Sequence, residues 1–279
     1  PTPSPRQSKP RNLRKEEMAP SRDLEEAKKA YRQRDIRASI AAHSAGPKER
    51  HQQEHGQYIK SAVYGGLDGI ITTFAVVAGV AGAKLAAGIV LILGFANLIA
   101  DGLSMAIGDY LSTKSEQEYE RAERRREEWE VEHYPEGEKQ ELVELYTDKG
   151  IAPEDAKTIV ELLAKTRTAW IDVMMVEELG ILGSDESPLK NAVVTFISFG
   201  LFGFVPLVAY VTALFVPILG TATFTVACAL TAATLFALGA VKVKITGRNW
   251  FKSGLETLLV GGVAAAAAYA VGVALGGLA

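Results

Sequence analysis

Apolar residues are concentrated in a few long stretches of this 279-residue chain, and polar segments separate them. A run of about 20 apolar residues is long enough to cross a bilayer as a helix. The stretches that qualify lie between Lys60 and Lys84, between Lys84 and Asp109, from Asn191 to Val241, and from Glu256 to Ala279. The third has no charged residue and is long enough for two spans, joined by a turn near Pro217 and Gly220. The pattern therefore predicts an all-α integral membrane protein with five transmembrane helices.

The polar segments divide the chain into four parts. These are a basic N-terminal extension, 1–57; the first two spans, 58–111; a domain inserted between the second and third spans, 112–189; and the last three spans, 190–279. Within the extension, residues 1–20 are rich in proline and basic residues, a composition that predicts disorder. Residues 21–42 are predicted to form a surface helix whose basic side chains suit an anionic lipid surface. No apolar segment precedes Lys60, so we expect the first span itself to direct membrane insertion.

Basic residues are distributed unevenly, and their distribution predicts the orientation. Of the 30 Lys and Arg residues, 14 lie in the first sixty positions, 11 lie within 112–190 and four lie within 242–252. Lys84 alone lies on the other side of the predicted membrane. Because Lys and Arg mark cytoplasmic loops, the N-terminus and the inserted domain are predicted to be cytoplasmic. The Ala- and Gly-rich spans favour a bacterial inner membrane, with a vacuolar membrane as the alternative.

Three helices are predicted in the inserted domain. The first continues from the second span to about His133, and the second covers about 138–148. The third begins at Pro153, a favoured first-turn residue, and ends near Gly180. The segment 112–190 has 21 acidic residues against 11 basic ones, a net charge of about −10. This charge predicts a cation as its partner, and no nucleic-acid partner is expected.

Glutamates recur along the first of these helices at spacings of three and four residues, which places them on one face. They are Glu116, Glu120, Glu123, Glu127 and Glu130, and the second helix adds Glu138 and Glu141. A solvated acidic face would explain them as well as a metal site would. Near the end of the third helix, however, Met174 and Met175 precede Glu178.

Carboxylates combined with thioether sulfur suit a borderline transition metal better than calcium or magnesium, which prefer oxygen alone. Fe²⁺ is the first candidate, followed by Mn²⁺, Co²⁺ and Zn²⁺. The metal would be cargo, and no prosthetic group is expected. Methionine packed as core filler is the alternative for Met174 and Met175.

Asp68 is the only charged residue in the first span, and a charge inside a membrane is costly and indicates a functional site. Met105 in the second span offers a sulfur ligand that does not titrate. Because metal and proton compete for a carboxylate, this pair would support metal/proton exchange. A structural or helix-capping role near the membrane edge is the alternative for Asp68. Gly65, Gly66 and Gly69 permit close helix contact, and a homodimer meeting along the first span would bring two copies of each ligand together.

Three further features are weak signals. His51–His55 reads HQQEH, formally the H-x-x-E-H zinc-protease pattern, but a solvated helix next to the membrane is the simpler prediction, with a weak metal contact left open. Glu130 and His133 form one E-x-x-H motif, whereas a ferritin-like di-iron oxidase requires two on facing helices. Cys228, the single cysteine, is predicted to be a small buried residue of the fourth span.

Four sequence elements together resemble the vacuolar iron transporter family of Fe²⁺/H⁺ antiporters, over nearly the whole chain from about His55. They are YGGLDGIITTFA, GLSMAIGDYLSTKSE, the glutamate series and WIDVMMVEEL, and the spacings between them also agree. The resemblance implies a dimer, with Asp68 and Met105 binding the ion in transit between the two copies of the first span. It also implies a cytoplasmic metal-binding domain whose ligands are Glu127, Glu130, Glu138, Glu141, Met174, Met175 and Glu178. The resemblance does not assign a ligand role to the other three glutamates of the acidic face, Glu116, Glu120 and Glu123.

One position departs from the family pattern. Plant members have a glutamate in the second span where this chain has Asn97, and Asp101 lies one helical turn later. Whether Asp101 takes over proton coupling is open, so Asn97 and Asp101 join Asp68 and Met105 in the predicted transport path. The sequence thus predicts a proton-driven exporter of cytoplasmic Fe²⁺, for detoxification or storage, and not an enzyme. A membrane-bound di-iron ferroxidase and a non-transporting metal sensor are the alternatives.

Overall fold

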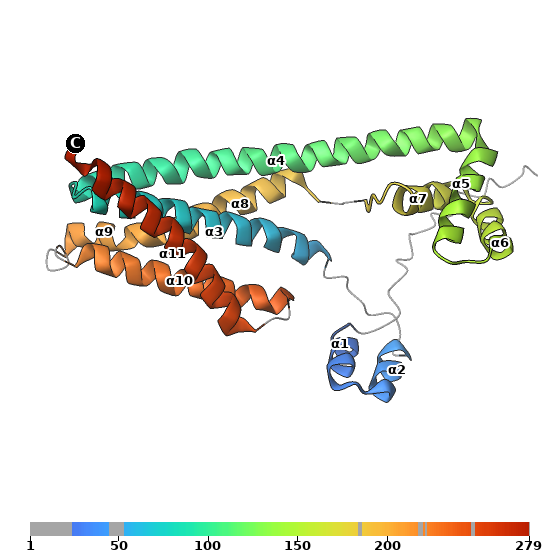
Figure 1. The fold of residues 1–279 in the computed structure, drawn as a ribbon, viewed down its shortest axis with the longest axis horizontal. Helices are drawn as coiled ribbons and strands as arrows, with labels where there is room; N and C mark the ends of the chain where they lie inside the picture. The colour runs from blue at the N-terminus through green and yellow to red at the C-terminus, as the bar shows by residue number, and fades with distance from the viewer. Residues whose placement is uncertain are drawn as a thin grey trace, which may run out of the picture. The chain divides into compact units, whose positions relative to one another are not determined.

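The computed structural model describes residues 24–44, 53–183, 186–216, 220, 222–246 and 249–278. Within these ranges every regular element is a helix, which confirms the all-α prediction (Figure 1). The helices are α1 Leu24–Gln33, α2 Ile36–Ser44, α3 Gln53–Gly82, α4 Ala87–His133, α5 Pro135–Asp148, α6 Pro153–Leu163, α7 Arg167–Glu177, α8 Pro188–Gly203, α9 Val205–Phe215, α10 Thr223–Thr246, α11 Trp250–Leu275 and a short 3₁₀ helix, Gly276–Leu278. The chain forms two compact units, residues 1–56 and 57–279.

The first unit contains two short helices, so the prediction of one surface helix over 21–42 was wrong. Arg34 has a φ of 52°, which ends α1. Asp35 then begins α2, because its Oδ1 accepts hydrogen bonds from the backbone N–H groups of Arg37 and Ala38 at 2.9 and 3.0 Å. The tail predicted to be disordered, 1–20, lies outside the described residues.

Four helices of the described chain are long and apolar enough to cross a membrane. They are Tyr58–Gly82, Ala87–His133, Thr223–Val241 and Trp250–Leu278. The helices α8 and α9 meet the same test only together, as a pair bent by 48°. Counted as one broken span, the pair brings the total to the five that the sequence predicts.

The bend between α8 and α9 has a local cause. Pro206 has no N–H to donate to the carbonyl of Phe202, and its ring would clash with that carbonyl in a straight helix. The last helix also differs from the prediction, since it begins at Trp250 and includes Glu256 instead of following it. The side chain of Asn249 fixes this start, because its Oδ1 accepts hydrogen bonds from the backbone N–H groups of Phe251 and Lys252 at 3.0 and 3.3 Å.

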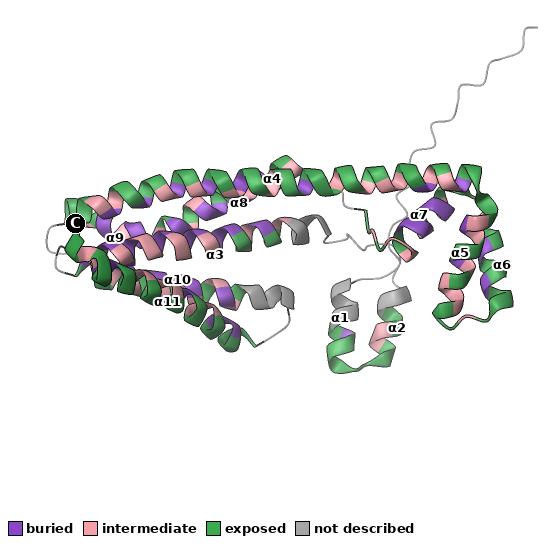
Figure 2. Cartoon of the chain, turned by 45° about the horizontal axis from the view of Figure 1, so that its top comes forward, coloured by how far each residue is buried: buried purple, intermediate pink, exposed green. Residues whose placement is uncertain are grey.

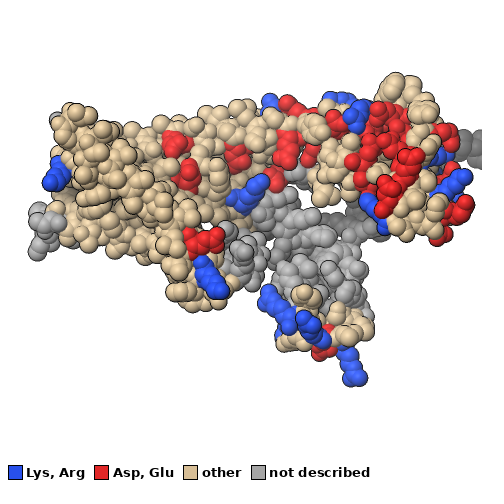
Figure 3. Space-filling model, in the orientation of Figure 1, with Lys and Arg blue, Asp and Glu red and all other residues tan. Residues whose placement is uncertain are grey.

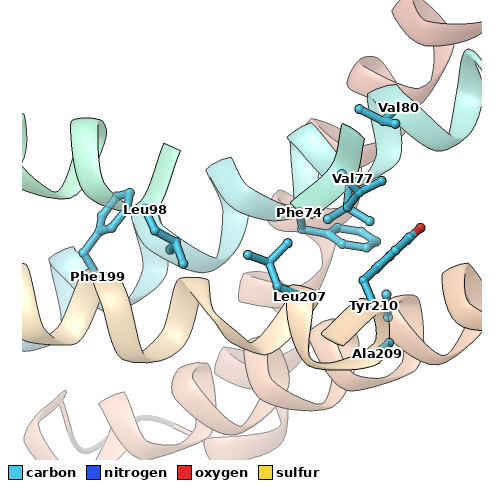
Figure 4. Close-up of a cluster of buried hydrophobic side chains, with 10 residues drawn as sticks. Phe74, Val77, Val80, Leu98, Phe199, Leu207, Ala209 and Tyr210 are labelled. Carbon is cyan, nitrogen blue, oxygen red and sulfur yellow. The ribbon is translucent and has the colours of Figure 1, made fainter. Parts of the chain in front are cut away.

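An apolar core joins the spanning helices (Figure 4). Its buried members come from α3, α4, α8, α9 and α10: Phe74, Val77, Val80, Val90, Leu98, Phe199, Leu207, Ala209, Tyr210 and Ala227. Cys228 is half-buried and packs against this core. Two glycines allow α3 to pack closely against α8. A Cβ on Gly65 would lie 2.6 Å from the carbonyl oxygen of Thr195, and a Cβ on Gly69 would overlap the carbonyl oxygen of Phe199. The α3–α8 contact therefore requires glycine at these positions.

Helix α4 continues beyond its apolar part and ends at His133, as predicted. Beyond it, α5, α6 and α7 pack with the end of α4 around a second apolar cluster, and buried residues are most frequent in α7 (Figure 2). The third predicted helix is in fact two, because residues 164–166 form a turn between α6 and α7. The turn lets Val160 of α6 and Trp170 of α7 face the same cluster, which a straight helix would prevent.

Candidate metal and transport sites

Five glutamates from three helices meet at the end of α4. They form two groups of three, and in each group one carboxylate oxygen from every residue lies within 4.8 Å of the other two. The groups are Glu127, Glu130 and Glu138, and Glu138, Glu141 and Glu178. Glu138 belongs to both. The i, i+3 spacing on α4 and again on α5 aims each pair of side chains at this point, and the end of α7 supplies the fifth. The structure thus brings together all five glutamates that the resemblance implied.

The chemical state of these carboxylates is unusual for a solvated acidic face. Glu127 is fully buried and Glu138 is 6% exposed. One oxygen of each of Glu127, Glu138 and Glu178 is buried without a hydrogen-bond partner. Buried carboxylates without partners are costly unless a proton or a cation neutralises them. Figure 3 shows the surrounding surface, where acidic side chains gather over α5–α7 and the adjoining part of α4.

Burial and mutual repulsion make the group bind protons more tightly. Desolvation, followed by the charge of Glu127 and of the other neighbouring glutamates, raises the pKa of Glu138 to about 7. Desolvation, followed by the charges of Glu127 and Glu141, raises the pKa of Glu178 to about 7. Burial also raises the pKa of Glu127, although a hydrogen bond from Arg126 opposes the shift. At neutral pH, Glu138 and Glu178 are therefore close to the midpoint of their protonation.

Met174 and Met175 lie beside the carboxylates in sequence but within the apolar cluster in space. Met174 is fully buried, Met175 is 6% exposed, and both pack with Leu142 and Trp170. This packing accounts for them as core residues. Their role as sulfur ligands remains a prediction.

The glutamates nearer the membrane have other surroundings. Glu116 is exposed, and the Glu123 carboxylate pairs with Arg126 at 3.0 Å. Glu120 lines a separate pocket of about 290 Å³ together with Arg124, Asp172 and other residues of α4, α7 and the following segment. These three glutamates lie outside the five-carboxylate group, in agreement with the distinction that the resemblance implied.

His133 does not join the carboxylates. The exposed imidazole stacks on Trp129, with ring centroids 4.5 Å apart, and its Nδ1 lies 2.8 Å from the backbone oxygen of the same residue. The E-x-x-H match that ends at His133 therefore places a glutamate in the group without the histidine that a di-iron centre would use.

In the spans, the turn of α3 that follows Asp68 is hydrogen-bonded to α4. Thr72 Oγ1 donates to the Asp68 carbonyl at 2.9 Å, and Asn97 Nδ2 donates to the hydroxyls of Thr72 and Thr73 at 3.3 Å each. Asp101 lies near enough to Asp68 for the two carboxylates to interact electrostatically.

Met105 completes a row on α4. Asn97, Asp101 and Met105 are spaced four residues apart, so they share one face of the helix, and all three are half-buried. Met105 packs at the edge of the apolar core. Of the predicted path residues on α4, Asn97 hydrogen-bonds to hydroxyls of α3, and Asp101 interacts electrostatically with Asp68.

Two residues with defined partners near these sites escaped the sequence analysis. Asp109 Oδ2 accepts hydrogen bonds from Ser61 at 3.1 Å and Thr195 at 2.5 Å, so it joins three helices where the sequence used it only to end an apolar run. Its position four residues after Met105 was the available signal. Arg126 lies among the glutamates, a position visible in the letters RRREEWE, and contacts three of them.

The glycines of the first span allow close helix contact, as the sequence predicts. Within one chain, Gly65 and Gly69 contact α8, and Gly66 faces the ring of Phe202. The meeting of two chains along the first span stays a prediction.

These features define a helical integral membrane protein in which one spanning helix extends to a cluster of carboxylates, two of them buried. Residues 59–273 match the model of the VIT family, and the chain belongs to this family.

Three relatives illustrate the match. The vacuolar iron transporter of Toxoplasma gondii is 43% identical over 265 residues, which cover 90% of this chain and 88% of the relative. The vacuolar iron transporter of Plasmodium falciparum is 36% identical over 260 residues, covering 90% and 95%. Vacuolar iron transporter 1 of Arabidopsis thaliana is 34% identical over 225 residues, covering 79% and 88%.

Proposed function

We propose that this protein is a proton-driven transporter that exports cytoplasmic Fe²⁺ across a membrane, for iron detoxification or storage, with Mn²⁺, Co²⁺ and Zn²⁺ as related cargo. The VIT family is a transporter family, and the relatives named above are called vacuolar iron transporters. Those names favour a vacuolar membrane over the bacterial inner membrane that the composition of the spans suggested. Membership of a transporter family makes the protein a transporter and not an enzyme.

One observation supports this proposal most directly: the same helix serves both carboxylate sites. Helix α4 is 47 residues long, about 70 Å at 1.5 Å per residue. It has Asn97, Asp101 and Met105 in its apolar part and Glu127 and Glu130 near its other end. A cation collected by the five glutamates would be held at one end of a continuous element whose other end lines the proposed path.

The two sites would divide the work of transport. In the proposed mechanism the five glutamates, with Met174 and Met175, concentrate metal on the cytoplasmic side. Asp68 and Met105 then bind the ion in transit, in a path between the first spans of a homodimer embedded in lipid. A proton that replaces the metal on Asp68 couples the two gradients, because one carboxylate cannot hold both. Asp101, electrostatically linked to Asp68, is the second carboxylate available for that proton.

The two alternatives have less support. A di-iron ferroxidase would use histidine ligands, and His133 is exposed and stacked on Trp129. A metal sensor would bind ions at the five glutamates without flux, which a transport assay distinguishes directly.

The proposal is tested in liposomes with an imposed pH gradient and Fe²⁺ under reducing conditions. We expect Asp68→Ala to reduce Fe²⁺ flux at least tenfold, because the variant lacks the one carboxylate of the first span. Asp109→Asn is the matched control, since Asp109 is also a half-buried acid of the spans but is held by Ser61 and Thr195. Flux in Asp68→Ala equal to that of the parent would refute the transport mechanism, and equal losses in both variants would assign Asp68 a structural role.

A further inference from the structure

Arg126 lies directly against the proposed metal ligands. Its Nη2 is 3.2 Å from Glu127 Oε1, its Nε is 3.4 Å from Glu130 Oε2, and its Nη1 is 3.0 Å from Glu123 Oε2. One guanidinium thus contacts two carboxylates of the five-glutamate group and one carboxylate outside it. The five N–H donors of an arginine, arranged in a fixed plane, suit such multiple contacts.

The contacts divide the oxygens of Glu127 into two kinds. Oε1 pairs with Arg126, whereas Oε2 is buried and has no partner. The Glu127 side chain is fully buried, yet that of Arg126 is 47% exposed. The positive charge therefore lies at the solvent side of the group and can leave without crossing the core.

Glu123 offers a place for the displaced guanidinium. It lies one turn before Glu127 on α4, and its side chain is 18% exposed. Arg126 already contacts it, so releasing Glu127 and Glu130 requires only a small rotation of a long side chain. The charge of Arg126 would remain paired throughout.

We infer that Arg126 is a tethered counter-ion: it occupies Glu127 and Glu130 when no metal is bound and moves onto Glu123 when a divalent ion takes its place. The inference rests on the proposed function, since it takes Glu127 and Glu130 as ligands. Arg126 acts through these ligands and is a positioning residue.

A tethered counter-ion weakens metal binding by a constant factor, because each binding event must first displace the arginine. A transporter benefits from this effect. An ion that is to be passed on must bind strongly enough to be captured and weakly enough to be released. Ions that interact weakly with carboxylates would fail to displace Arg126, so the residue also favours strongly coordinating divalent ions.

The test compares two neighbouring arginines in the full-length protein in detergent, with Mn²⁺ titrated at pH 7 by calorimetry. We expect Arg126→Gln to tighten Mn²⁺ binding roughly tenfold, because the ion no longer has to displace the guanidinium. Arg125→Gln removes the same charge from an exposed neighbouring position and is expected to change the affinity less than twofold. Equal affinities in the two variants, or weaker binding by Arg126→Gln, would overturn the inference.

The midpoint of thermal unfolding is a second readout, measured with and without Mn²⁺. Without metal, the midpoint of thermal unfolding should fall in Arg126→Gln, because buried Glu127 loses its partner. The rise in that midpoint on adding Mn²⁺ should be larger than in the parent. If Arg126→Gln does not fold, Arg126→Lys replaces it. We expect the lysine variant to bind Mn²⁺ a few-fold more tightly than the parent. A lysine variant that binds as the parent does would also count against the inference.

Failure of the inference and of the proposed site can be distinguished. A Glu127→Gln/Glu130→Gln variant that binds Mn²⁺ as tightly as the parent would refute these residues as ligands, and with them the site. Loss of binding in that variant, together with equal affinities of Arg126→Gln and Arg125→Gln, would leave the site intact and remove only the role of Arg126.

Discussion

Glu138 is the residue on which the carboxylate group depends, because both triads include it and its side chain is 6% exposed. The raised pKa values of Glu138 and Glu178, each about 7, determine how the group responds to pH. Below about pH 4.5 these carboxyls are protonated in both the folded and the unfolded chain. Between about 4.5 and 7 the unfolded chain ionises first, so without metal the free energy of unfolding falls as pH rises.

Metal binding should show the opposite dependence, since the ligands must lose their protons. We expect the Mn²⁺ affinity of the purified protein to increase by at least tenfold between pH 5.5 and 7.5, measured by calorimetry. Glu138→Gln should weaken binding and flatten this pH dependence. Glu144→Gln, at an exposed glutamate of the same helix, is the control and should retain both. A Glu138→Gln variant with the full pH dependence would show that other groups release the protons.

At the scale of the helices, the contacts between them determine which positions require glycine. Gly65→Ala would place a Cβ 2.6 Å from the backbone oxygen of Thr195, and backbone cannot move aside as a side-chain end can. We expect this variant to lose about 1–3 kcal/mol of stability, seen as a lower midpoint of thermal unfolding in detergent. Gly108→Ala is the matched control, because no atom lies within 4 Å of a Cβ there and alanine favours a helix. An unchanged midpoint in Gly65→Ala would mean that α3 and α8 do not pack this closely.

The same contacts explain which elements the sequence could predict. The end of α4 before Pro135 and the start of α6 at Pro153 follow from local signals, and both were predicted correctly. The break between α6 and α7 has no proline or glycine in residues 164–166, and it depends on burying both helices in one core. Likewise, Gly65 indicates a close contact but not its partner, which only the folded chain identifies.

The candidate site was predictable to a similar extent. Helical spacing placed Glu127 with Glu130 and Glu138 with Glu141, whereas the meeting of both pairs with Glu178 came from the resemblance, because it depends on how three helices pack. Arg126 was missed because a basic residue in an acidic helix usually forms a surface ion pair. Its contact with a fully buried carboxylate became visible only in the structure.

At the scale of the molecule, α4 connects two sites that should fail in different ways. If the five glutamates supply ions and Asp68 passes them on, Glu138→Gln should raise the Fe²⁺ concentration for half-maximal flux roughly tenfold while maximal flux largely persists. Asp68→Ala should reduce flux at least tenfold at every Fe²⁺ concentration, while Mn²⁺ binding at the glutamates stays as in the parent. Flux in liposomes at low and saturating Fe²⁺, with calorimetry on the same preparations, measures both effects. If Glu138→Gln instead abolished flux even at saturating Fe²⁺, the glutamates would belong to the path itself, and the 47-residue helix would form one continuous site instead of joining two.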